Sequence, residues 1–220
     1  MKKIIIIHIL ILTIITMITS YLLYNLNVIT HKKYTNADFS IDTYISKIDK
    51  DNDGIDDQTE IINNTRSYIA TKPKYKSKYY ANGYSDDEYG VCTDVVAIGY
   101  REAGYDLREL VDNHIENNRE LYDIEYVDWN IDYRRVENLL VFFKHNFIEL
   151  TTDPKDISEW KPGDILVMDG HVGVLSDKRC PNGLPLVIHH TEKDPHIREE
   201  NLIETRKDIV AHFRVTPTIK

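Results

Sequence analysis

The sequence predicts an α+β fold in which helices come first along the chain and an antiparallel sheet follows. Between residues 92 and 146, apolar residues recur at the three- and four-residue spacing of amphipathic helices. From Trp160 onward, short runs rich in valine and isoleucine alternate with turn sequences that contain proline, glycine or asparagine. Helices and strands that are segregated in this way are typical of the α+β class.

The first 33 residues are expected to form a membrane anchor. Residues 4–23 contain no Asp, Glu, Lys or Arg, and about 20 apolar residues let a helix cross the roughly 30 Å hydrocarbon core of a bilayer. A cleaved secretory leader is the alternative, although the run is longer than a usual leader core and no small-residue cleavage motif follows it. We expect a single-pass protein of the cell membrane with an extracytoplasmic domain, or a secreted protein if the leader is removed.

The rest of the chain is acidic and long enough for one domain with a small appendage. Residues 34–220 carry 23 basic and 36 acidic side chains, a formal charge of −13. This charge repels nucleic acid and anionic lipid surfaces, so we expect no nucleic-acid partner. We also expect no organic cofactor and a monomeric protein. The expected units are an anchor over residues 1–33, a helix–loop–helix over 34–70 and the main domain over 71–220.

Two amphipathic stretches flank the acidic loop of residues 49–60 and predict the helix–loop–helix. Apolar residues follow an i, i+3, i+4, i+7 pattern over residues 41–48, and a similar stripe runs over residues 61–69. Further helices are expected from Cys92 to a C-cap at Gly104, from Leu107, and within residues 134–146. Strands are expected on both sides of Gly170 and in the segments PLVI and IVAHFRV.

The acidic loop has the residue spacing of an EF-hand calcium loop. Its oxygen donors occupy positions 1, 3, 5, 9 and 12, a glycine stands at position 6, and position 7 offers a backbone carbonyl. The expected ligands are Asp49, Asp51, Asp53, the carbonyl of Ile55, Asp57 and Glu60. A single unpaired loop favours a structural calcium ion over a sensor, and a solvated acidic turn is the alternative. One departure is Asp56 at position 8, where EF-hands usually have an apolar residue.

Cys92 is one of only two cysteines and lies where a helix is expected to begin. A helix N-terminus favours thiolate, so we expect a lowered pKa and a nucleophilic sulfur. His171 and His189, from the predicted strands, are candidate partners for a catalytic triad. Three alternatives stay open: a buried structural cysteine, a disulfide with Cys180, and a zinc site formed by Cys92, His171 and His189 without the usual ligand spacing.

Seven blocks of the sequence resemble, in order, the signature blocks of a bacterial family known only as domain of unknown function 1287. The blocks are GVCTDVV, AGYDLRELV, NIDYRRVENLLVFF, WKPGDILV, HVGVLSDKR, VIHH and AHFRV, within about residues 60–216. That family in turn is similar to the NlpC-type, papain-like cysteine peptidases and amidases of cell walls. The resemblance implies a papain-like fold with Cys92 as nucleophile, His171 as base and His189 as the orienting residue. It also implies that Tyr80 lies near the oxyanion site.

The chain departs from the family pattern at two positions. His190 and Cys180 stand where the family usually has asparagine, which argues against a chemical role for Cys180. Because successive side chains of a strand point to opposite faces, only one of His189 and His190 can face the site, and the sequence leaves open which.

The predicted function is hydrolysis of amide bonds, with peptidoglycan peptides as the substrate. Arg134 and Arg135 are candidates for binding a substrate carboxylate, and pairing of an arginine with Asp132 at a helix start is the structural alternative. The alternative function is a non-catalytic cell-wall binding module of the same fold, stabilised by calcium.

Overall fold

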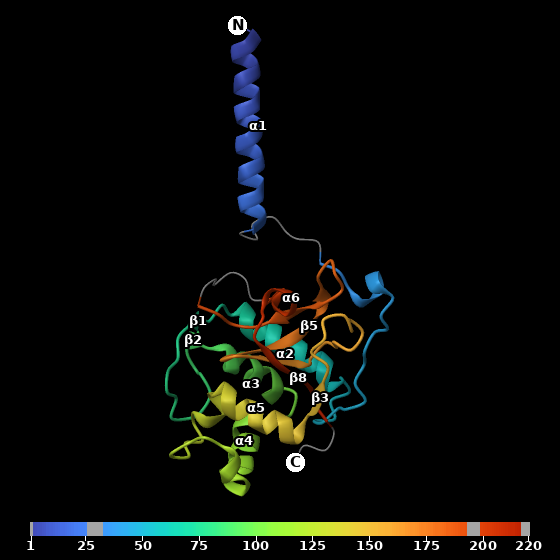
Figure 1. Ribbon diagram of the computed structural model, residues 1–220. Helices are drawn as coiled ribbons and strands as arrows, with labels where there is room; N and C mark the ends of the chain where they lie inside the picture. Colours follow the sequence, from blue (N-terminus) through green and yellow to red (C-terminus); the bar gives the residue numbers. More distant parts are fainter. Residues whose placement is uncertain (1, 26–32, 193–198, 217–220) are drawn as a thin grey trace. The chain divides into compact units, whose positions relative to one another are not determined.

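The computed structural model describes residues 2–25, 33–192 and 199–216 (Figure 1). Its contacts divide the chain into two compact units, Met1–Lys33 and Tyr34–Lys220. The first unit is helix α1 (Lys2–Asn25), in which the stretch Lys3–Leu23 has a mean hydropathy of 2.4 and is not buried. The predicted apolar N-terminal helix is thus confirmed. Its length and composition are compatible with a membrane anchor or a signal sequence.

The second unit is built on a six-stranded sheet in the order β3-β8-β4-β5-β6-β7, and every neighbouring pair is antiparallel. The helices that precede it and the antiparallel sheet confirm the predicted mixture of helix and strand. Gly170 forms the turn between β4 and β5 with a φ of +61°, a backbone region that glycine enters without strain. The strands are β3 (Ile148–Leu150), β4 (Ile165–Met168), β5 (His171–Arg179), β6 (Pro185–Ile188), β7 (Glu199–Glu200) and β8 (Ile209–Arg214).

Helix α3 lies at the centre of the second unit, packed against helix α2 on one side and strand β5 on the other. Gly99 allows the close approach of α2, because a Cβ at this position would meet the Thr65 hydroxyl and lie 3.2 Å from the carbonyl oxygen of Ile61. The helices are α2 (Asp57–Ala70), α3 (Cys92–Arg101), α4 (Leu107–Asn117), α5 (Val136–Asn146) and α6 (Leu202–Thr205). Short 3₁₀ turns are η1 (Asn36–Phe39), η2 (Arg119–Leu121) and η3 (Asp132–Arg134). A small parallel pair joins β1 (Lys74–Tyr75) to β2 (Tyr89–Gly90).

The helix expected over residues 41–48 does not form, and the prediction of a complete helix–loop–helix is wrong. Backbone N–H groups in this stretch and just after it donate to side chains at the start of α2 instead of to carbonyls of a helix. The N–H of Ser46 donates to Asp56 Oδ1 at 3.1 Å, and the N–H of Lys50 donates to Asp57 Oδ1 at 2.8 Å. Ile45, one of the expected apolar contacts, is 69% exposed. The acidic loop therefore has a helix only on its C-terminal side.

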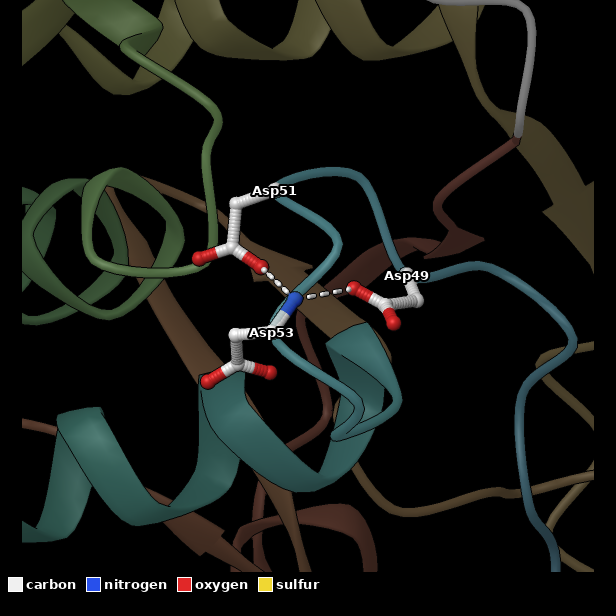
Figure 2. A group of neighbouring side chains, drawn as sticks. All are labelled: Asp49, Asp51 and Asp53. Carbon is white, nitrogen blue, oxygen red and sulfur yellow. Dashed lines mark hydrogen bonds between the residues drawn. The ribbon is translucent and has the colours of Figure 1, made fainter.

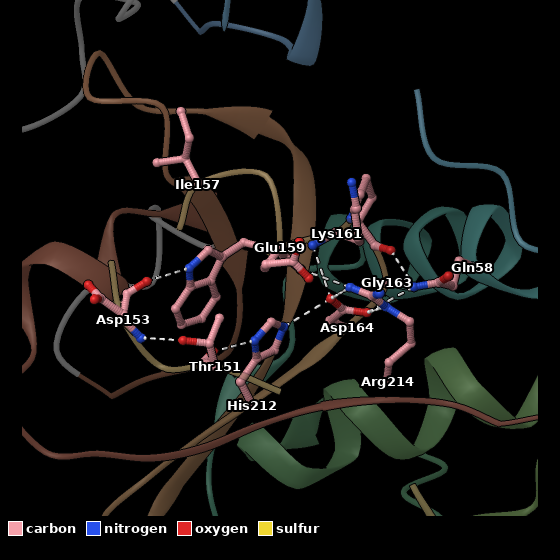
Figure 3. A network of polar contacts seen from close by, with 12 residues as sticks. Gln58, Thr151, Asp153, Ile157, Glu159, Lys161, Gly163, Asp164, His212 and Arg214 are labelled. Carbon is pink, nitrogen blue, oxygen red and sulfur yellow. Dashed lines mark hydrogen bonds and ion pairs between the residues drawn. The ribbon is translucent and has the colours of Figure 1, made fainter. Parts of the chain in front are cut away.

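Asp164 is a fully buried acceptor that joins three parts of the second unit (Figure 3). Its carboxylate accepts hydrogen bonds from helix α2, from the turn before β4 and from strand β8. The donors are Gln58 Nε2 at 3.0 Å, the Lys161 N–H at 3.0 Å, His212 Nε2 at 2.9 Å, and Arg214 Nε and Nη2 at 2.7 and 2.6 Å. We call these five residues the Asp164 network. A buried carboxylate needs such partners to offset its lost hydration.

His212 has a structural role within this network. Its Nε2 faces Asp164 and its Nδ1 lies 2.9 Å from the carbonyl oxygen of Thr151. The ring is therefore held through both of its nitrogens, between the carboxylate and the carbonyl oxygen. The imidazole stacks on Trp160 with ring centroids 4.3 Å apart and an interplanar angle of 6°.

Candidate active site

Cys92 is the first residue of α3, as the sequence predicts, and is 5% exposed. Val91 precedes it in an extended conformation, with φ −134°, and the chain turns into the helix at the cysteine. Asp94 Oδ2 accepts the N–H of Val91 at 2.8 Å, which satisfies one of the free donors at the helix start. The helix start is therefore held rigidly around the sulfur.

The expectation that Cys92 has a lowered pKa is wrong. Burial raises the pKa of the Cys92 thiol above its ordinary value, because the low-polarity surroundings disfavour the thiolate. Backbone N–H groups of Val172 and Thr93 lower the pKa of the thiol, but burial outweighs them. The resting cysteine is therefore a neutral thiol near neutral pH and needs a base in order to attack.

A base lies on the adjoining strand. The N–H of Val172 contacts the sulfur of Cys92. The beginning of β5 therefore packs against the start of α3. His171, the first residue of β5, directly precedes Val172. Its Nε2 lies 2.9 Å from Nδ1 of His189, and the two rings are nearly perpendicular at 86°. The structure thus places both predicted histidines together beside the cysteine helix.

Glu200 adds a carboxylate that sequence reasoning missed. His189 Nε2 lies 2.6 Å from Glu200 Oε1, on the two-residue strand β7 that pairs with β6. A carboxylate only accepts hydrogen bonds, so His189 donates through Nε2, and with its ring neutral it accepts through Nδ1. His171 must then donate through its own Nε2, which leaves the lone pair of His171 Nδ1 unprotonated. The chain Glu200–His189–His171 therefore fixes the tautomer that a general base requires.

The electrostatics of His171 also suit a base. Burial, with further contributions from His189 and Arg206, lowers its pKa to about 3. The imidazole is consequently neutral across the physiological range and has its lone pair available. Asp208 acts in the opposite direction but does not offset the burial.

His189, not His190, contacts His171. His190 is fully buried and its ring meets Tyr75 edge-on, with centroids 5.1 Å apart. Tyr75 is itself near the sulfur, because its pKa is raised first by burial and then by the charge of Cys92. The two consecutive histidines thus lie on opposite faces of the chain, as strand alternation requires.

Tyr75, and not Tyr80 as expected, is the tyrosine whose pKa responds to Cys92. The hydroxyl of Tyr80 donates to Asp87 Oδ1 at 2.7 Å, and its side chain is 7% exposed. Tyr75 is 39% exposed and pairs in register with Gly90, two residues before Cys92. This choice could not be made from the sequence, because several tyrosines occur within residues 75–80 and the two-residue β1–β2 pairing decides which one approaches the cysteine.

The two arginines have different surroundings. Arg134 Nε and Nη2 each lie 2.8 Å from the carboxylate of Asp94, and the guanidinium also donates to the carbonyl of Lys78. The side chains of this pair are each 1% exposed, so Arg134 holds the helix start and is not open to a substrate. Arg135 lies 3.2 Å from Asp132 and remains 44% exposed. Asp132 thus pairs with an arginine at a helix start, which was the structural alternative.

The predicted disulfide and metal sites involve the two cysteines and the acidic loop. Cys92 and Cys180 are both free, and burial raises the pKa of Cys180 to about 12. Over the described ranges, one group of potential metal-binding side chains has its ligand atoms within 4.8 Å of one another, and it is Asp49, Asp51 and Asp53 (Figure 2). The two histidine nitrogens that face each other are already hydrogen-bonded, which gives the zinc alternative no support.

Other acidic residues of the loop differ in their surroundings. Asp57 is fully buried, accepts the Lys50 N–H at 2.8 Å and accepts the hydroxyl of Tyr105. Burial and then repulsion from neighbouring aspartates raise the pKa of Glu60 to about 7. Asp57 therefore holds the loop to the rest of the fold through these two hydrogen bonds, whereas Glu60 lies near the aspartates of the loop.

The neutral thiol and neutral imidazole predict a distinctive alkylation profile. In a Cys180→Ala background, the rate at which iodoacetamide modifies Cys92 is expected to rise continuously with pH to beyond about pH 9, because a raised pKa delays thiolate formation. Mass spectrometry of the alkylated protein measures the rate. A plateau between about pH 5 and pH 8 would instead show a preformed thiolate–imidazolium pair and contradict the prediction.

Comparisons with known proteins identify the family that the seven sequence blocks resemble. The family model described as "Domain of unknown function (DUF1287)" matches residues 60–215. The chain is also similar to the uncharacterized protein YijF of Escherichia coli (strain K12), with 34% identity over 152 residues that cover 64% of this chain and 72% of that protein. No solved structure matches the chain. Because the family match spans more than half of the chain, including Cys92, His171, His189 and Glu200, the protein belongs to the DUF1287 family.

Proposed function

We propose that the protein is an extracytoplasmic cysteine hydrolase that cleaves amide bonds in cell-wall peptides, as the NlpC-type enzymes it resembles do. The observation that carries the proposal is the series Glu200–His189–His171 at hydrogen-bond distances, in which His171 directly precedes Val172, whose N–H reaches the buried sulfur of Cys92. A nucleophile at a helix start, a base on a strand and an orienting residue directly after the next strand match the roles of a catalytic triad.

The first half of the reaction uses His171 as a general base and then as a general acid. As Cys92 Sγ attacks the substrate carbonyl carbon, its proton passes to His171 Nδ1 and the carbonyl electrons move to the oxygen. When the tetrahedral intermediate collapses, the C–N bond breaks and His171 gives the proton to the leaving amine. The product is a thioester between Cys92 and the acyl part of the substrate.

Water completes the turnover. His171 removes a proton from the water as it attacks the thioester, the C–S bond breaks, and the thiolate recovers the proton from His171. The imidazolium that forms in each half is stabilised through its Nε2–H by His189, which is held in turn by Glu200. In this arrangement His189 and Glu200 are positioning residues.

Two donors are available for the developing oxyanion. The backbone N–H of Cys92 lies at the positive end of α3, where main-chain donors are free. The hydroxyl of Tyr75, which senses the charge of Cys92, is the second donor in this proposal. Tyr75 replaces Tyr80 in that role.

A non-catalytic cell-wall binding module is the second candidate, and the low exposure and raised pKa of Cys92 favour it. The test incubates the full-length protein in detergent with purified peptidoglycan and measures new amino groups and sedimentation. The hydrolase is supported by new amino groups that appear with wild-type protein. Co-sedimentation without new amino groups supports the binding module and overturns the hydrolase.

Glu200 provides a sharper test of the positioning chain. A Glu200→Gln variant keeps an oxygen acceptor for His189 but removes the charge that favours the imidazolium form. We expect kcat to fall about tenfold with little change in KM, because the effect acts on the transition state. Glu204→Gln, an exposed change four residues further on, is the matched control and should leave both constants unchanged. An unchanged kcat in Glu200→Gln would remove Glu200 from the mechanism.

A further inference from the structure

The acidic loop before α2 has no part in the proposed hydrolysis, yet its backbone N–H groups hold three aspartates close together. The backbone N–H of Asp53 donates to Asp49 Oδ1 at 3.2 Å and to Asp51 Oδ1 at 3.3 Å (Figure 2). The N–H of Gly54 donates to the other oxygen of Asp49 at 3.0 Å. These contacts draw three carboxylates together, with ligand atoms within 4.8 Å of one another. Acidic clusters of this kind also occur on surfaces that bind nothing, so the three aspartates alone do not indicate a bound ion.

Glu60 has a buried carboxylate oxygen that lacks a partner. It lies in the first turn of α2, is 9% exposed, and its Oε2 is buried without a hydrogen-bond partner among the residues that the structure describes. Asp49, Asp51 and Asp53 of the loop are close enough to Glu60 to repel its charge. An unpartnered buried carboxylate oxygen is costly in a folded protein, and a bound cation is the partner that this position lacks.

The donor set identifies the cation. Asp49, Asp51, Asp53 and Glu60 stand at positions 1, 3, 5 and 12 of the loop, and the carbonyl of Ile55 stands at position 7. All the donors are oxygen atoms, and a bidentate glutamate at position 12 raises their number to six, within the range that Ca²⁺ takes. Zinc and the softer metals prefer nitrogen or sulfur ligands.

We propose that residues 49–60 bind one Ca²⁺ ion through Asp49, Asp51, Asp53, the carbonyl of Ile55 and both oxygens of Glu60. Asp57, at position 9, is not a ligand, because its two oxygens bind the Lys50 N–H and the Tyr105 hydroxyl. It anchors the loop to the protein instead.

The ion stabilises the whole second unit through the start of α2. Gln58, two residues before Glu60, donates to Asp164 Oδ1 at 3.0 Å and to the carbonyl of Pro162 at 2.8 Å. Ile61, the residue after Glu60, is fully buried in the same core cluster as Cys92. A ligand that binds the folded loop and not the unfolded chain raises the free energy of unfolding by mass action. Calcium is therefore expected to raise the melting temperature of the unit that carries the active site.

The experiment measures the melting temperature and terbium luminescence of the full-length protein in detergent, after removal of divalent cations. Calcium is expected to raise the melting temperature of the wild type, and magnesium at equal concentration to raise it less. Terbium is expected to luminesce on tyrosine excitation, because Tyr105 contacts Asp57 beside the site, and calcium should displace it.

Glu60→Gln separates binding from folding. Without calcium this variant is expected to melt at or above the wild-type temperature, because it removes a buried, repelled charge. With calcium it is expected to lose the thermal shift and at least about tenfold in affinity. Asp86→Asn, an exposed change of the same charge outside the loop, should respond like the wild type. The proposal is overturned if calcium leaves the wild-type melting temperature unchanged, or if wild type and Glu60→Gln respond alike; neither readout depends on hydrolysis.

Discussion

Replacing Cys92 with alanine is expected to abolish amide hydrolysis, with the rate of amine release from peptidoglycan falling at least about 10³-fold. In the proposed mechanism the Cys92 sulfur forms the bond to the substrate carbonyl, whereas the hydroxyl of the neighbouring Thr93 donates to the carbonyl of Arg134 at 3.2 Å. Alanine removes only the sulfur from a helix position whose backbone is held by Asp94. The variant should therefore keep its fold and its affinity for the polymer while losing turnover.

Cys180→Ala is the matched control for this prediction. Cys180 is also buried and free, but burial raises the pKa of its thiol to about 12, and its backbone hydrogen bonds are to Gly183 and Leu184. Its removal should leave the hydrolytic rate within about twofold of the wild type, apart from any loss of folded protein that circular dichroism reveals. If Cys92→Ala retains wild-type turnover, or if the control loses as much activity, the assignment of the nucleophile is wrong.

His171 distinguishes a general base from a spectator. His171→Ala should lower turnover by about 10²- to 10⁴-fold, the usual contribution of a positioned base. Because the pKa of His171 is lowered to about 3, the wild-type rate should stay high as the pH falls and decline only where the imidazole becomes protonated. A steep loss of activity near pH 6 to 7, where an ordinary histidine titrates, would contradict this.

Local patterns were enough to predict the elements that carry the cysteine and the base. Helix α3 begins at Cys92 because an apolar stripe starts there and Asp94 caps the free N–H of Val91. The hairpin of β4 and β5 follows from two apolar runs around Gly170. These features depend on residues within a few positions of one another, so periodicity and turn chemistry contain the information.

The features that could not be predicted depend on contacts between distant residues. The stretch over residues 41–48 has a helical pattern, but Asp56 accepts the N–H of Ser46 within it and Asp57 accepts the N–H of Lys50 just after it. Glu200 lies on a strand of two residues, and its contact with His189 exists only because β7 pairs with β6. The pKa of Cys92 shows the same limit, because helix position is visible in a sequence while burial depends on the whole core.

Asp164→Asn is expected to cost about 3–5 kcal/mol of stability and to lower the melting temperature by about 10 °C. The substitution keeps the size of the side chain but removes the charge that His212 and Arg214 share (Figure 3). The amide nitrogen would also turn a donor toward groups that already donate. Because His212 is fully buried and Arg214 is 14% exposed, neither side chain can recover full hydration.

Asp153→Asn is the control, because it makes the same chemical change at an exposed position beside the network. The side chain of Asp153 accepts only the nearby Lys155 N–H, at 2.9 Å, and its substitution should alter stability by less than about 0.5 kcal/mol. Thermal unfolding followed by circular dichroism compares the two variants. Equal, small shifts would mean that His212 and Arg214 find other partners, whereas a large shift in Asp164→Asn alone would show that this carboxylate joins α2, β4 and β8. Since Gln58 connects the same carboxylate to the start of α2, calcium should raise the melting temperature of Asp164→Asn less than that of the control.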